Sequence, residues 1–373
     1  MLISPFFIYS IIWGITLILY ELKLSKLYPN LEIELLMFIL ITIFSNLFLG
    51  IITLKKIKRN YYTKKNAMLN VKKVFIVLII LYILDFCYGG SIPLINVLVN
   101  KKITYLSFKG IPLFHGFLYS ISLYYSIKSF FIYIKLKEKK YLLIYLTGLL
   151  FPILCYSRGF ILLIIVSSIV ILLFQNRKYL KKAVLVGIIV LYLFGMAGNV
   201  RHHYDVLDTT MIKKIAIIDT EESILDPFYW SYVYISSPLG NLQTNIKSQY
   251  HQYSLKKFLT TNLLPEFISE KIITTTAPTK RMVSNLTVST MYIKAYNNFG
   301  IIGMYIIFIL YTLFNMIYIR LLENTKNYQV GITLLYLIQV FSIFSNMYTL
   351  SSVGISLFYV FIYKIKNIIS YKK

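Results

Sequence analysis

Long apolar runs fill this chain, and short basic segments separate most of them. A helix of roughly 20 predominantly apolar residues spans a bilayer, so runs of about this length predict membrane-spanning helices. The runs number about ten, and they cover roughly residues 5–20, 35–54, 74–88, 112–134, 141–155, 159–174, 183–197, 301–319, 329–346 and 351–363. The pattern therefore predicts an all-α polytopic membrane protein.

Composition and charge agree with that class. Hydrophobic residues make up 58% of the 373 positions, charged residues 14%, and the mean hydropathy is +0.69. These values exclude an ordinary soluble domain. The net charge of +25 does not indicate nucleic acid binding, because the lysines concentrate in short loops between apolar runs, as in an inserted membrane protein.

The lysine distribution predicts the orientation of the chain. Basic residues follow the second, fourth, sixth and tenth apolar runs, and the segment 55–73 carries eight of them with no acid. Cytoplasmic loops of membrane proteins are enriched in lysine and arginine. We therefore expect both termini in the cytoplasm, with the loops 21–34, 89–111, 156–158, 198–300 and 347–350 outside.

This topology divides the chain into three parts. Residues 1–197 would form helices 1 to 7, residues 198–300 a large outer loop that is partly helical and interfacial, and residues 301–373 helices 8 to 10 with a cytoplasmic tail. The outer loop contains three of the four histidines and eight of the fourteen acidic residues, so chemistry is expected there. The cytoplasmic loops show no nucleotide-binding motif, which predicts a substrate already activated in the membrane and no cofactor.

Three motifs occur in a characteristic order. A Ser-Arg-Gly turn opens an apolar run (157–159), a Tyr-Ile-x-x-Pro-Leu segment lies in the outer loop (234–239), and an Asn-x-x-x-Ser-Thr-x-Tyr segment leads into Asn-Phe-Gly-x-x-Gly (285–303). In this order and topology, residues 140 to 320 resemble the oligosaccharide repeat-unit polymerases, the Wzy-type O-antigen and capsule polymerases of bacteria. The first hundred residues match that family only in hydropathy.

The resemblance implies an outer-facing, metal-independent glycosyltransferase of the bacterial inner membrane. Such an enzyme moves a growing glycan from undecaprenyl diphosphate onto the non-reducing end of a new lipid-linked repeat unit. The expected partners are undecaprenyl-diphosphate-linked oligosaccharides and membrane lipids, with a chain-length regulator protein as a further candidate, and no nucleic acid.

Arginines on the outer side are the main candidates for binding the diphosphate. The chain has six arginines, and three of them, Arg158, Arg201 and Arg281, fall on the predicted outer side, where basic residues are disfavoured. A guanidinium binds phosphate oxygens bidentately and stabilises charge that develops on a leaving group. We assign the catalytic role to Arg281 and substrate binding to Arg158 and Arg201, and expect all three to converge. Contact with lipid phosphates is the alternative interpretation.

The acceptor hydroxyl needs a general base, and histidine titrates nearest neutral pH. His202 and His203 directly follow the seventh apolar run, so they are the catalytic candidates, although loop histidines are more often surface residues. Four carboxylates compete with them for this role: Asp85, Asp205, Asp208 and Glu266. Asp85 is the only acid inside a predicted span, and carboxylates in membrane segments are usually functional. A metal site is a poorer interpretation, because no matching ligand cluster accompanies the two histidines.

Further polar and aromatic residues of the outer loop are candidates for holding glycan. They are Tyr234, Lys280, Asn285, Tyr292 and Lys294. The alternative for the hydroxyls and amides is capping of the following helix. The aromatic run 228–234 is more simply read as an anchor in the headgroup layer, and Pro238-Leu239-Gly240 as a turn.

Other functions stay open. A flippase or transporter of lipid-linked oligosaccharides would share the membrane and the substrate, but it should carry polar residues along its spans, which are almost free of charge here. A membrane acyltransferase would be expected to place histidine and arginine in early helices, and the first three spans contain neither. An O-antigen ligase differs from the polymerase only in its acceptor.

Overall fold

The computed structural model describes residues 4–53, 69–100, 108–175, 179–201, 205–221, 223–249, 251–273, 279–323 and 325–362. Within these ranges every regular element is a helix, which confirms the predicted all-α class. In chain order the helices are α1 (Pro5–Glu21), α2 (Ile33–Thr53), α3 (Val71–Gly89), α4 (Pro93–Asn100), α5 (Phe114–Leu136), α6 (Lys139–Leu154), α7 (Arg158–Gln175), α8 (Leu180–Arg201), α9 (Thr210–Ala216), α10 (Phe228–Lys247), α11 (Leu255–Leu263), α12 (Glu266–Ile272), α13 (Ile293–Leu322), α14 (Tyr328–Phe341), α15 (Ser351–Gly354) and α16 (Ser356–Tyr359).

Five of the described helices are long and apolar enough to cross a membrane: α2, α5, α7, α8 and α13. The count is six if α3 and α4, which meet at a bend of 55°, form one broken span. The ten predicted spans are therefore not confirmed. The last predicted span, 351–363, contains two four-residue helices, α15 and α16, in place of one long helix.

Outward-facing apolar side chains support the assignment to a membrane. On α8, Val184, Leu185 and Leu193 are each more than half exposed, and α2 exposes Phe44 and Phe48 in the same way. Water-facing surfaces seldom carry apolar patches of this extent. Contact with lipid explains such faces, because apolar side chains that face lipid avoid the free-energy cost of exposure to water.

The described parts of the segment 198–300 form the last turn of α8, helices α9 to α12 and the first turns of α13. The predicted turn at Pro238-Leu239-Gly240 is wrong, because all three residues lie buried inside α10. The expected anchoring role of the preceding aromatic run is wrong for Trp230 and Tyr232, which are 4% and 7% exposed in the protein core. Both errors have one cause: α10 packs against α1 and α8, so its aromatic residues meet protein.

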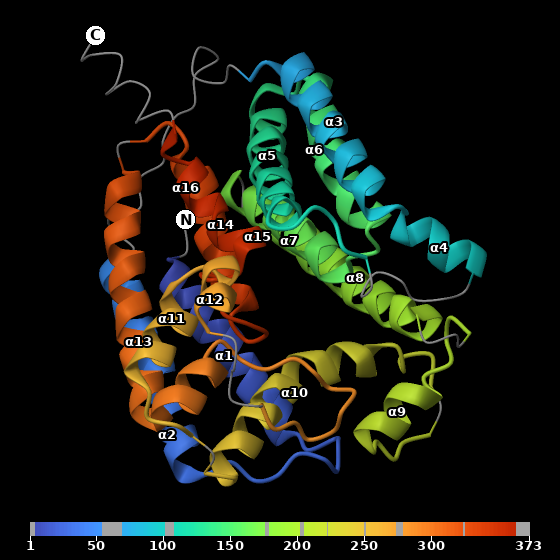
Figure 1. Cartoon of the computed structure of the whole chain (residues 1–373). Helices are drawn as coiled ribbons and strands as arrows, with labels where there is room; N and C mark the ends of the chain where they lie inside the picture. The colour runs from blue at the N-terminus through green and yellow to red at the C-terminus, as the bar shows by residue number, and fades with distance from the viewer. Residues whose placement is uncertain are drawn as a thin grey trace.

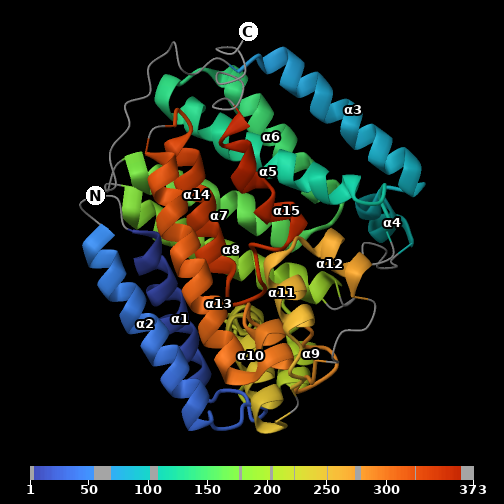
Figure 2. The ribbon, with the colours of Figure 1, turned by 60° about the vertical axis from the view of Figure 1, so that its left-hand side comes forward.

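Two large apolar cores organise the molecule. In the first core α1, α2, α10 and α13 pack together, and in the second core α5, α7 and α14 pack with the end of α13. Figure 1 and Figure 2 show α9 and α10 at the end of the molecule opposite the α5–α6 connection. α7 belongs to the second core, where it packs on both α5 and α14.

α13 breaks at the point where the polar segment gives way to apolar sequence. Phe299 and Gly300 have non-helical backbone angles, and φ at Gly300 is +65°, a conformation that favours glycine. The irregular segment 251–254 is hydrogen-bonded to the first turns of α13. The backbone N–H groups of Gln252 and Ser254 donate to the carbonyls of Asn297 and Asn298. The Asn-Asn-Phe-Gly sequence therefore joins the polar segment to a candidate span.

Candidate functional site

The larger described cavity, of about 370 Å³, lies at the N-terminus of α7. Its walls are mostly apolar, with contributions from α7, α8, α10 and the chain that follows α14. Its polar groups come from residues 156–158 and from Ser231, Tyr234 and Ser352. An apolar hollow with a few polar groups at one end suits an amphiphilic ligand.

Arg158 places a positive charge at this cavity. Its guanidinium carbon lies 5.1 Å from the centre of the Phe194 ring, within the range of a cation–π contact. The same ring meets Tyr234 edge-on, at 4.9 Å between centres. The aromatic ring of α8 therefore links the arginine of α7 to the tyrosine of α10, so Arg158 and Tyr234 line one cavity.

The start of α7 adds a second source of positive potential. The backbone N–H groups of Phe160 and Ile161 donate to the carbonyl of Ser157, at 3.2 and 3.1 Å, and this begins the helical ladder. The N–H groups of Arg158 and Gly159 precede that ladder, and amides at a helix N-terminus favour anions. A Cβ built on Gly159 would meet no atom within 4 Å, so the backbone there borders open space.

A smaller cavity of about 220 Å³ adjoins the first. It is lined by His115 and Tyr119 of α5, by Cys155, and by residues that line the larger cavity too: Ser157, Phe160 and Ser352. The two cavities therefore meet at the start of α7. A ligand bound across them would contact groups from both sides.

His115 and Asp85 form a dyad at this smaller cavity. The distance between His115 Nδ1 and Asp85 Oδ2 is 2.6 Å, and the backbone N–H of Ile111 donates to Asp85 Oδ1 at 3.0 Å. The Asp85 side chain is fully buried, whereas the His115 side chain is 29% exposed. The carboxylate is thus enclosed by its partners, and the imidazole borders the cavity.

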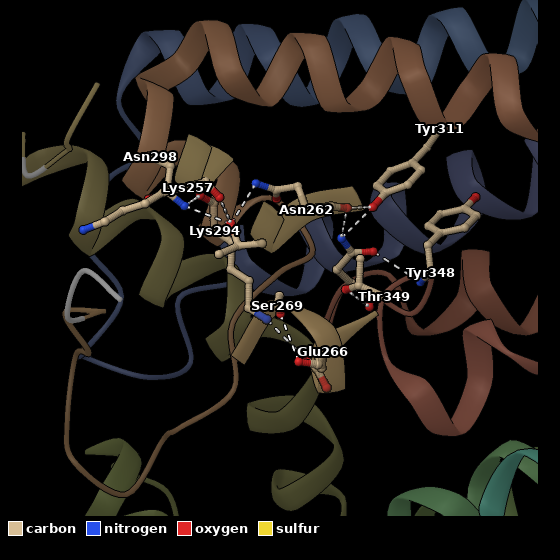
Figure 3. Close-up of polar contacts among 11 residues, drawn as sticks. Lys257, Asn262, Glu266, Ser269, Lys294, Asn298, Tyr311, Tyr348 and Thr349 are labelled. Carbon is tan, nitrogen blue, oxygen red and sulfur yellow. Dashed lines mark hydrogen bonds and ion pairs between the residues drawn. The ribbon is translucent and has the colours of Figure 1, made fainter. Parts of the chain in front are cut away.

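A polar network fastens α11 and α12 to α13 (Figure 3). Lys294 Nζ lies 3.1 Å from Glu266 Oε1, and Asn298 donates to Thr261 at 3.0 Å. Asn346, from the chain after α14, donates to the Tyr311 hydroxyl at 2.7 Å. Through the ion pair and the amide hydrogen bonds, these residues connect separate elements and have a structural role.

Tyr348 joins the same network from the connection between α14 and α15. Its hydroxyl donates to Asn315 Oδ1 at 2.8 Å and accepts from Gln339 Nε2 at 2.9 Å. Burial raises the pKa of this phenol, and the two hydrogen bonds lower it in part. The hydroxyl therefore remains protonated at neutral pH, so it acts as a donor and not as a base.

Of the residues predicted from sequence, the structure brings Arg158 and Tyr234 to one cavity. Lys280, Arg281 and Asn285 are exposed on the segment 279–290, and none of them lines the larger cavity. The predicted convergence of three arginines is untested, because the side chain of Arg201 lies outside the described residues. His202 and His203 lie outside them as well.

Two further candidates have contacts of their own. Tyr292 is 1% exposed, and its hydroxyl lies 2.7 Å from the hydroxyl of Tyr9 in the first core. Lys294 pairs with Glu266. Packing and the ion pair give each residue a structural role, which sequence position alone does not reveal.

The dyad is the feature that sequence reasoning missed. Asp85 was identified as an unusual intramembrane acid, and His115 lies at the start of a predicted span, but nothing in the sequence pairs them across 30 positions. The sequence offered one indication of this contact: both residues lie near the predicted outer ends of their helices. Among the described residues, no three His, Cys, Asp or Glu side chains gather closely enough to hold a metal ion.

These features define a class: a protein whose described residues are all-helical in their regular structure and include five or six helices that could cross a membrane, with two adjoining cavities at the start of α7. The chain matches no protein-family model, no curated protein and no solved structure.

Proposed function

We propose that the protein is a polysaccharide polymerase: a metal-independent glycosyltransferase that joins undecaprenyl-diphosphate-linked repeat units on the outer face of the bacterial inner membrane. The observation that carries the proposal is the larger cavity, in which Arg158 and the N-terminus of α7 meet apolar walls. A prenyl diphosphate has this same combination of an anionic head and an apolar tail.

The chemistry of the transfer requires stabilisation of the leaving group. When the bond between the donor sugar and the diphosphate breaks, the bonding electron pair stays on the diphosphate oxygen. A fixed guanidinium and helix-terminal amides stabilise that developing charge more than they stabilise the ground state, which lowers the barrier. Arg158 and the start of α7 together supply both groups.

Aromatic side chains suit the saccharide part of the substrate. Tyr234 lies in the cavity wall beside Phe194 and near Phe344, at 4.9 and 6.4 Å between ring centres. Such rings offer apolar faces for sugar rings and, in tyrosine, a hydroxyl for hydrogen bonding. We assign the first sugar of the donor to this part of the cavity.

The test is chain extension by purified protein from lipid-linked repeat units, read as a ladder of glycan lengths. Arg158→Lys should lower the extension rate on the order of 10²-fold, because lysine keeps the charge but cannot bind two phosphate oxygens with a planar fork. Arg320→Lys is the matched control, since Arg320 is an exposed residue near the end of α13 and should leave the ladder unchanged.

Arg281→Lys, measured beside these variants, separates two assignments. The sequence pattern gives Arg281 the catalytic role, whereas the cavity gives it to Arg158. A larger loss in Arg158→Lys supports the cavity, and a larger loss in Arg281→Lys supports the sequence assignment. A wild-type protein that extends no lipid-linked glycan contradicts the polymerase, and transfer of a single glycan to a different acceptor would indicate a ligase.

A further inference from the structure

The His115–Asp85 dyad has the form of a preorganised general base. An ionised carboxylate only accepts hydrogen bonds, so Asp85 selects the tautomer that carries its proton on His115 Nδ1. The lone pair is then on Nε2. The N–H of Ile111 fixes the other carboxylate oxygen at 3.0 Å, which holds the orientation of the pair.

Gly110 leaves room for the contact between Asp85 and His115. A Cβ built on Gly110 would lie 2.5 Å from Asp85 Oδ1 and 2.6 Å from His115 Nδ1, which is closer than side chains approach. Any larger residue at this position would therefore push the dyad apart. Glycine permits the carboxylate and the imidazole to meet beside the backbone.

Aromatic residues restrict the imidazole on several sides. Its ring centre lies 5.5 Å from Phe108, 5.0 Å from Tyr119 and 5.9 Å from Phe151. The ring nevertheless borders the smaller cavity and is 29% exposed. A hydroxyl-bearing ligand in this cavity would meet the imidazole beside Tyr119 and beside Ser157 and Ser352, which line the same cavity.

The position of the cavity relates the dyad to the anion site. Both cavities include Ser157, Phe160 and Ser352 in their walls, so the imidazole of the smaller cavity and Arg158 of the larger one flank the start of α7. A base on one side of a sugar carbon and an anion site on the other side is the arrangement that displacement of a diphosphate requires. No other described histidine lines either cavity.

We propose that the smaller cavity binds the acceptor sugar and that His115 is its general base, held in position by Asp85. This proposal rests on the proposed polymerase function. The acceptor hydroxyl gives its proton to His115 Nε2 as its oxygen bonds to the donor carbon. The bond from that carbon to the diphosphate breaks, and its electron pair leaves on the diphosphate. The imidazolium then releases the proton to water.

The experiment measures the extension rate of full-length protein in the ladder assay. His115→Ala should lower kcat on the order of 10²–10⁴-fold, the usual contribution of a positioned base, and added imidazole should restore part of the rate by entering the vacated space. His251→Ala is the matched control, because His251 contacts Tyr253 at 3.1 Å and lines neither cavity.

Asp85→Asn and Gly110→Ala test the positioning of the base. Both should lower kcat with little change in KM, since the acceptor still binds but the imidazole is misoriented; neither loss should respond to imidazole, because the ring still occupies its place. Gly187→Ala is the control for the glycine, since a Cβ there meets no atom within 4 Å. The abundance and melting temperature of each variant are measured alongside.

The outcomes separate the two proposals. Wild-type protein that forms no ladder contradicts the polymerase itself. A wild-type ladder with an unchanged rate in His115→Ala contradicts only the base assignment, and so does a loss in His115→Ala that imidazole does not restore while the protein remains folded. Restoration by imidazole in His115→Ala alone supports the base.

Discussion

Asp226 shows how single residues hold the polar segment together. Its side chain is 5% exposed, and Oδ2 lies 2.6 Å from Lys213 Nζ and accepts a hydrogen bond from Thr209 at 3.0 Å. Lys213 also donates to the carbonyls of Thr220 and Glu221. The buried pair thereby connects α9 to the start of α10.

Asp226→Ala should destabilise the protein by about 3–5 kcal/mol, because the change leaves a buried ammonium without its counter-charge. Asp219→Ala is the matched control: its pair with Lys26 is exposed and longer, at 3.4 Å, so its loss should cost at most about 1 kcal/mol. Thermal unfolding in detergent measures both. Equal melting temperatures for the two variants would contradict the structural role of the buried pair.

At the scale of elements, two asparagines of α10 bind a whole stretch of backbone. Asn241 donates to the carbonyls of Leu286 and Val288, both at 2.7 Å, and accepts from the N–H of Met282 at 2.9 Å. Asn245, one turn later, binds both backbone groups of Lys280. The side chains thus satisfy a segment that has no regular structure of its own.

Asn241→Ala should release the segment 279–290 from α10, because three hydrogen bonds to its backbone are lost together. Limited trypsin digestion should then cleave faster after Lys280 and Arg281. Thr244→Ala is the control, since the Thr244 hydroxyl donates to the carbonyl of Gly240 in its own helix at 2.9 Å. An unchanged cleavage rate in Asn241→Ala would mean that other contacts hold the segment.

Sequence patterns predicted the elements better than their partners. The starts of α2, α5 and α7 follow from hydropathy, because each helix consists largely of one long apolar run. α10 was misjudged because Trp230 and its neighbouring tyrosines are equally suited to a headgroup layer and to a protein core. Only the packing of α10 between α1 and α8 distinguishes these environments.

At the scale of the whole molecule, the site depends on distant parts of the chain. The two cavities draw their walls from residues between Phe108 and Ser352, and the dyad adds Asp85 from α3. Arg158 and Tyr234 were predictable as chemistry-bearing residues from their motifs. Their joint placement was not, because hydropathy does not encode which helix ends meet.

The last prediction concerns the orientation of the molecule in the membrane. The lysines of the α5–α6 connection predict that this end is cytoplasmic, and Figure 1 places α9 and α10 at the opposite end. In a background lacking Cys87 and Cys155, an impermeant thiol reagent should label Tyr253→Cys in intact cells, since Tyr253 is 71% exposed in the polar segment.

Lys139→Cys is the matched position at the other end, exposed at the start of α6, and it should be labelled only after the membrane is permeabilised. Labelling of Lys139→Cys in intact cells together with protection of Tyr253→Cys would invert the topology. The polar segment would then face the cytoplasm, where lipid-linked repeat units awaiting polymerisation on the outer face are out of reach. The proposed polymerase would therefore be excluded, whatever the chemistry of its cavities.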